Sequence, residues 1–114
     1  MSYELPYDFV LRELYPFRPK IRKMLGCYAL IKEKQILMLL RDRESQPEFN
    51  GVFVATTPEY YAALQHEIHI SKMEFDLDGD ENSWIFISED LDEFEQKVKK
   101  ACEMIKKGDE RIGK

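Results

Sequence analysis

Both histidines of the chain lie in one short stretch, His66-Glu67-Ile68-His69. Residues three apart share a face of a helix, so two imidazoles in this arrangement could bind one metal ion. A metalloprotease motif places its histidines four residues apart, with a glutamate after the first and a third ligand elsewhere. Glu67 fits that pattern, but His69 comes one residue too early. We therefore expect two partly exposed histidines, and a metal-binding protein or enzyme using His66 and His69 is the alternative.

Two other motifs resemble ligand-binding loops but lack essential members. Residues 108–114 have the glycine and lysine spacing of a phosphate-binding P-loop, but they follow a predicted helix and offer no Ser or Thr for magnesium. Asp76, Asp78, Asp80 and Asn82 alternate around a glycine that stands too early for an EF-hand, and the required glutamate is missing. We expect a frayed tail and an acidic hairpin tip. No nucleophile elbow is present, so the sequence predicts no catalytic residue, no cofactor and no metal.

A basic run precedes the first apolar strand and supplies the candidate partner-binding residues. These are Arg18, Lys20, Arg22 and Lys23. With two aromatic residues beside them they could form a weak nucleic-acid patch. The formal net charge of −5 argues against a general nucleic-acid or anionic-membrane binder, so nucleic acid is not the expected partner. The simplest interpretation is a solvated connector whose cations pair with carboxylates of the chain; the functional one is a contact site for an acidic partner.

Length and composition indicate a single globular domain over residues 1–114. The chain is 44% hydrophobic and 34% charged, which excludes a disordered protein. Cys27 and Cys102 have no spaced partner, so both are expected to be free buried thiols in a reducing compartment. The first residues are not expected to act as a signal peptide, and the longest apolar run, Ile36–Leu40, is too short to span a bilayer. The expected location is the cytoplasm.

Hydrophobic spacing predicts the secondary structure that must position these residues. Helical stripes are expected near residues 6–15, 58–68 and 90–107, and Gly108 is expected to end the last helix. Thr57 can cap the second helix, with Thr56 and Glu59 as an alternative capping box, and Ser88 or Asp90 can cap the third. Short apolar runs bounded by turn residues predict five strands, at 27–31, 36–40, 52–55, 73–77 and 84–87. The order is therefore helix, three strands, helix, two strands, helix. The predicted core consists of Met24, Leu30, Leu39, Phe53, Leu64, Phe75, Phe86, Phe94, Val98 and Ile105.

Two of the predicted strands are apolar on both faces. Ile36–Leu40 and Trp84–Ile87 present large side chains to both sides of the sheet. In a two-layer domain the helices cover only one side, and monomers rarely expose large apolar patches. We therefore expect a homodimer that buries the same patch on each subunit, together with an unknown protein partner.

From Arg22 onward the chain resembles the N-terminal domain of the bacterial TfoX/Sxy family. The resemblance rests on Lys23-Met24-Leu25-Gly26, on the strand pair across Glu33-Lys34, on Val54-Ala55-Thr56-Thr57 and on Trp84, and it covers roughly residues 18–107. It implies an α+β fold of two layers, α-β(3)-α-β(2)-α, with helices packed on an antiparallel sheet. This fold is shared with secretion-chaperone-like and YjbR-like domains. It also implies a small non-enzymatic regulatory or protein-binding domain without an active site.

Overall fold

The computed structural model describes residues 5–24, 26–70 and 83–114. Within these ranges the chain forms three α-helices, five strands and one short 3-10 helix. In chain order they are α1 (Phe9–Leu14), β1 (Lys20–Met24), β2 (Cys27–Lys32), β3 (Gln35–Arg41), η1 (Pro47–Phe49), β4 (Gly51–Ala55), α2 (Tyr61–Ile68), β5 (Trp84–Ser88) and α3 (Phe94–Lys106).

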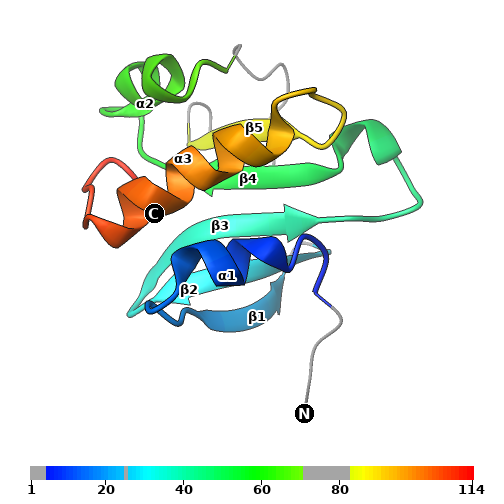
Figure 1. Cartoon of the computed structure of the whole chain (residues 1–114), viewed down its shortest axis with the longest axis horizontal. Coiled ribbons are helices and arrows are strands. Elements are labelled where there is room, and N and C mark those ends of the chain that lie inside the picture. Colours follow the sequence, from blue (N-terminus) through cyan, green and yellow to red (C-terminus); the bar gives the residue numbers. More distant parts are fainter. Residues whose placement is uncertain (1–4, 25, 71–82) are drawn as a thin grey trace.

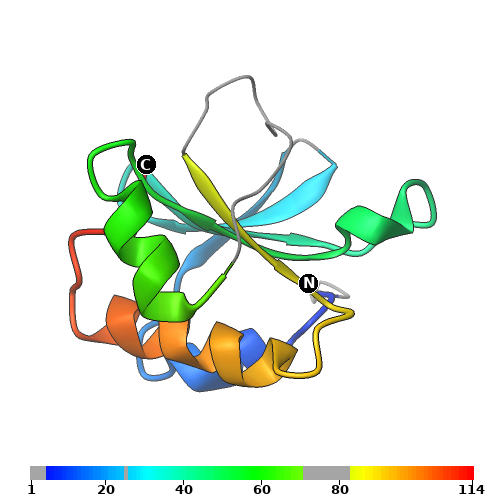
Figure 2. The ribbon, with the colours of Figure 1, turned by 90° about the horizontal axis from the view of Figure 1, so that it is seen from above.

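The strands form one antiparallel sheet whose order follows the chain, β1-β2-β3-β4-β5 (Figure 1). Within the described residues, β1 and β5 are therefore its two edges. Figure 2 shows α1, α2 and α3 on the same side of the sheet. The predicted α+β class, with helices packed in a layer on an antiparallel sheet, is confirmed.

One predicted connector is a strand. Residues 20–24, expected as part of the basic run, form β1, so four strands precede α2 rather than three. Pairing with β2 explains why the segment is a strand. The backbone hydrogen bonds come from β2, whereas the charged sequence of residues 20–24 does not by itself predict a strand. The predicted strand at 73–77, the acidic hairpin tip at 76–82 and the core residue Phe75 lie outside the described residues.

The core on the helix side joins the sheet to all three helices. Leu30, Leu64 and Val98 are fully buried there, and Phe94 and Ile105 are nearly so, as predicted. Their positions come from the 3.6-residue period of the helices and the two-residue period of the strands. The predicted core residues Met24 and Phe86 are only half-buried, and both lie on the opposite, helix-free face of the sheet.

The helix-free face has its own apolar cluster. Leu39, Phe53 and Trp84 are at most 1% exposed within the single chain. The sequence predicted that this face would be exposed to solvent in a monomer. Leu39, Phe53 and Trp84 are instead buried within the single chain. The rings of Phe53 and Phe86 stack with centroids 4.6 Å apart, so neighbouring strands cover each other's side chains. The half-buried remainder comprises Met24, Ile31, Ile36 and Phe86.

The predicted caps of the later helices are wrong. No side-chain cap hydrogen bond is present at α2, which begins at Tyr61, and the Thr57 hydroxyl has no partner among the described residues. The neighbouring Thr56 hydroxyl, fully buried, donates instead to the Arg111 carbonyl oxygen at 2.6 Å. Asp90 likewise lies before α3 in a turn closed by Ser88 Oγ. Tertiary contacts and local turns therefore override the local capping signals.

The predicted end of α3 is confirmed. Gly108 has a φ of 76°, and its N–H donates to the Ile105 carbonyl oxygen at 3.0 Å. The N–H of Asp109 donates to the Met104 carbonyl oxygen, also at 3.0 Å. This pair of bonds satisfies helix carbonyls that would otherwise lack donors, and it needs a residue that tolerates the left-handed region.

Candidate functional site: a basic edge strand

Strand β1 forms an edge of the sheet and carries most of the candidate partner-binding residues. Its register with β2 pairs Lys20 with Ile31, Arg22 with Ala29 and Met24 with Cys27. Residues opposite one another in an antiparallel pair point to the same face. Lys20, Arg22 and Met24 therefore lie on the helix-free face. Ile21 packs against the helix-side core and anchors the strand.

The cations of this region are all exposed. We call Arg18, Lys20, Arg22 and Lys23 the basic edge. Among the residues that the structure describes, none of the four forms an ion pair with a carboxylate. The predicted pairing of these cations with the chain's own acids is thus not found in the described part. Two cations lie over aromatic rings instead: Arg18 over Tyr15 at 5.7 Å and Lys23 over Tyr28 at 5.6 Å.

A hollow of about 490 Å³ lies beside the basic edge. Side chains of Met24, Ile31 and Ile36 supply its apolar lining, and Lys20, Arg22, Glu33 and Lys34 supply its charged lining. Apolar surface bounded by cations suits a ligand that presents apolar side chains and negative charge together.

The sequence pointed to these cations but not to their setting. Only Ile21 and Met24 are apolar in the segment 20–24, and they do not alternate. The signal that could have revealed β1 is the following strand: a hairpin across Leu25-Gly26 would place Lys20–Met24 beside Cys27–Ile31.

The two histidines lie at the end of α2, with ring centroids 6.0 Å apart. Both are exposed, and they line a shallow depression with Ala62, Gln65 and Ile70. His69 ends the helix with a φ of 62°. Among the described residues, no three His, Cys, Asp or Glu side chains gather closely enough to hold a metal ion. The pair therefore offers two ligands, whereas structural zinc sites use four.

The segment that resembles a P-loop is neither a P-loop nor a frayed tail. After the Gly108 turn it runs back to the sheet, where Gly113 N–H donates to the Ala55 carbonyl oxygen at 2.9 Å. The backbone N–H and C=O of Lys114 pair with those of Ile36 at 3.1 and 3.0 Å. Ile112 is 4% exposed. The prediction of a frayed tail was wrong, because these bonds and Ile112 fix the segment to β3 and β4.

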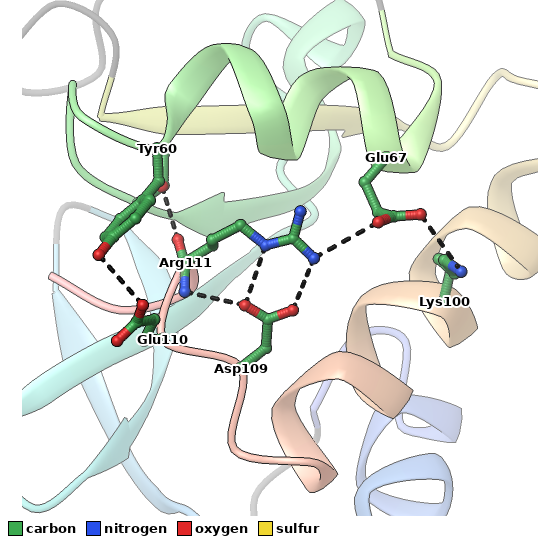
Figure 3. Close-up of polar contacts among 7 residues, drawn as sticks. Tyr60, Glu67, Lys100, Asp109, Glu110 and Arg111 are labelled. Carbon is green, nitrogen blue, oxygen red and sulfur yellow. Dashed lines mark hydrogen bonds and ion pairs between the residues drawn. The ribbon is translucent and has the colours of Figure 1, made fainter.

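Ionic contacts hold this segment to α2, and α2 to α3 (Figure 3). The Arg111 guanidinium donates to Asp109 Oδ2 at 2.7 Å and to Glu67 Oε1 of α2 at 3.4 Å. Lys100 of α3 lies 3.6 Å from the other Glu67 oxygen. The hydrogen bond from Arg111 lowers the pKa of Asp109 below its ordinary value, because it favours the ionised carboxylate. The contacts are structural and lie outside the basic edge.

This pKa shift predicts a pH-dependent coupling. The Asp109–Arg111 pair should stabilise the fold by about 1 kcal/mol when Asp109 is ionised. A lowered folded-state pKa means that the contribution is present above the unfolded pKa, about 3.9, and is lost as pH falls through the folded value. A double-mutant cycle of Asp109→Asn and Arg111→Gln, followed by urea unfolding, should show a larger coupling at pH 6 than at pH 2. An equal coupling at both values would contradict this assignment.

Sequence reasoning also missed Arg41, which is 6% exposed. Its guanidinium donates to Asn50 Oδ1 at 2.7 Å and to the carbonyl oxygens of Ser45 and Gln46. The charged loop between β3 and β4 is therefore organised around a buried cation. Burial raises the pKa of the Cys27 thiol, and Arg41 partly opposes that rise. As predicted, Cys27 and Cys102 are buried thiols.

Comparison of the chain with protein-family models, with curated proteins and with solved structures finds no match. The site must therefore be interpreted from its own geometry.

Proposed function

We propose that the chain is a non-enzymatic protein-binding domain that contacts an acidic surface of its partner through the basic edge. The observation that carries this proposal is the placement of four exposed cations, three on an edge strand and Arg18 just before it, in a chain of net charge −5. None of the four forms an ion pair among the described residues. Unpaired cations attract a negative partner and raise its rate of association. The regulatory role implied by the TfoX/Sxy resemblance stays a prediction, as does the cytoplasmic location. Among the described residues, no helix is long and apolar enough to cross a membrane.

Reversal of the basic edge should abolish partner binding. A photo-crosslinking residue is introduced as Lys34→benzoylphenylalanine, beside the edge but outside its four cations, and the protein is expressed in its native host. We expect protein adducts from this position that disappear in the double variant Lys20→Glu, Arg22→Glu, because two attractive charges become repulsive. The purified adduct partner should bind the domain with an affinity that falls as salt rises.

The matched control places the same crosslinker at Lys107, an exposed position after α3, with the single reversal Lys106→Glu. Adducts that form equally at both positions, or that survive the reversal of Lys20 and Arg22, would contradict the proposal. The absence of any adduct at Lys34 would contradict it as well.

Nucleic acid is the alternative partner of the same cations. Four phosphate contacts would make the logarithm of DNA affinity fall with the logarithm of salt at a slope of roughly −3 to −4. The net charge opposes this alternative, and so do the apolar side chains in the adjoining hollow. A DNA affinity with that slope, lost on reversal of Lys20 and Arg22, would replace the protein-binding proposal.

The 6.0 Å separation of the His66 and His69 rings keeps the metal-binding alternative open to test. Elemental analysis of untagged protein decides it. Stoichiometric zinc that disappears in the variants His66→Ala and His69→Ala would favour a metal-binding function.

We also propose that the chain forms a homodimer through the helix-free face. The surface is smaller than the sequence predicted, because Leu39, Phe53 and Trp84 are already buried. What remains for a twofold contact is the half-buried group Met24, Ile31, Ile36 and Phe86. The first three also line the hollow beside the basic edge, so a dimer formed here and the acidic partner would compete for the same surface. Sedimentation equilibrium should show twice the 13.6 kDa chain mass at roughly 50 µM. A single species at the chain mass would contradict the dimer.

A further inference from the structure

The outer edge of β1 is the feature that carries this inference. Among the described residues, β1 pairs with β2 alone, and every residue from Lys20 to Met24 is exposed or half-buried. A strand in this position presents a row of backbone N–H and C=O groups to solvent. We infer that the partner of the proposed function binds here by adding an extended acidic strand to β1. This inference rests on the proposed function and specifies its partner and mode of binding.

The alternation of β1 sets the side chains that the added strand must carry. Residues directly opposite one another share a face and contact each other. Lys20 and Arg22 lie on the helix-free face and Lys23 on the other, so acidic side chains suit the positions opposite all three. Ile21 and Met24 are the half-buried apolar members, so apolar side chains suit the positions opposite them.

The resulting pattern is acidic, apolar, acidic, acidic, apolar, read in the order Lys20 to Met24. An apolar side chain opposite Met24 would lie on the same face as the hollow that contains Ile31 and Ile36. One opposite Ile21 would extend the helix-side core, against which Ile21 packs. The three acidic side chains would pair with the cations that lack ion pairs among the described residues. Backbone pairing, charge and apolar contact therefore all favour a partner strand with this pattern.

A second copy of this chain does not suit the same edge. A twofold antiparallel pairing of β1 with β1, centred on Arg22, would place Arg22 against Arg22. Like charges directly opposite one another destabilise a strand pair. Charged side chains on an edge can also serve only to prevent such pairing. In that case the edge would bind no strand at all, which is a measurable outcome.

Synthetic peptides test the inference directly. The probes are two labelled heptapeptides, Thr-Glu-Val-Glu-Glu-Val-Thr for parallel and Thr-Val-Glu-Glu-Val-Glu-Thr for antiparallel addition, measured by fluorescence anisotropy with the full chain. One of them should bind, and a scrambled peptide of equal charge should bind roughly tenfold more weakly. Two versions of the binding peptide carry N-methyl groups on alternate sets of residues. Only one set points its N–H groups at β1, so one version should lose at least about tenfold in affinity and the other little.

Charge exchange tests the register. Lys20→Glu should lower the affinity for the heptapeptide that binds the unaltered chain. A peptide with lysine in place of the glutamate opposite residue 20 should restore binding to this variant. The matched variant Lys107→Glu should leave both peptides unchanged.

Equal effects of the two N-methylated sets would overturn strand addition and leave the proposed function standing, provided that the Lys34 adducts depend on Lys20 and Arg22. Failure of both heptapeptides to bind at about 1 mM would overturn the acidic-strand assignment in the same way. If the Lys34 adducts persisted after reversal of Lys20 and Arg22, that result would instead contradict the proposed function itself.

Discussion

Replacing Phe94 with alanine should lower the free energy of unfolding by about 3–5 kcal/mol. Phe94 is 9% exposed at the start of α3. Its ring meets that of Tyr7 edge-on at 5.3 Å and that of Phe9 of α1 at 6.1 Å. Truncation removes these contacts and leaves a cavity between two helices that α1, only six residues long, cannot collapse to fill.

Urea unfolding followed by the fluorescence of Trp84 measures this change, with an unaltered slope as the check on two-state behaviour. The control is Leu91→Ala, in the same region but 39% exposed, which should cost less than about 0.5 kcal/mol. A loss below about 1 kcal/mol for Phe94→Ala would show that the ring is not part of the core.

Replacing Gly51 with alanine should destabilise the protein by about 3 kcal/mol or more. Gly51 begins β4 with a φ of 149°. An added Cβ would clash with the Ile87 carbonyl oxygen and would lie 3.0 Å from the Glu89 nitrogen. Both are backbone atoms, so neither can rotate away as a flexible side chain would. The strands β4 and β5 must separate locally, or the substituted residue must leave its conformation.

Gly108→Ala provides the matched comparison for Gly51→Ala. Gly108 also has a positive φ, 76°, but nothing lies within 4 Å of an added Cβ. Its substitution should therefore cost only the conformational strain, about 1 kcal/mol. Thermal and urea unfolding of both variants separate strain from steric clash. Equal losses would show that the close approach of β5 to Gly51 does not limit the fold.

Local patterns predicted the parts of the fold that depend on neighbouring residues. The apolar run Ile36–Leu40 lies within β3, and Trp84–Ile87 lies within β5. The stripe of α3 and the glycine that ends it were equally readable. Burial of alternate strand residues, or of one stripe of a helix, imposes a short period on the sequence, and a short period can be recognised without knowing what packs against it.

Contacts between distant residues decided the parts that the sequence did not reveal. Thr56 caps no helix, because its hydroxyl donates to Arg111, 55 residues away. The tail at 112–114 is fixed by bonds to Ile36 and Ala55. In both places hydrogen bonds to residues distant in the sequence decide the conformation. The sequence of a few neighbouring residues does not show that such distant partners exist.

The candidate site shows the same division. The amino-acid sequence by itself determined that four cations stand close together in a chain of net negative charge. Only the tertiary structure decided that three of them belong to an edge strand, with Lys20 and Arg22 lining an apolar hollow and Lys23 on the opposite face. The physical reason is that Lys20–Met24 carries too few apolar residues to specify a strand. Its conformation comes from the hydrogen bonds and register that β2 supplies.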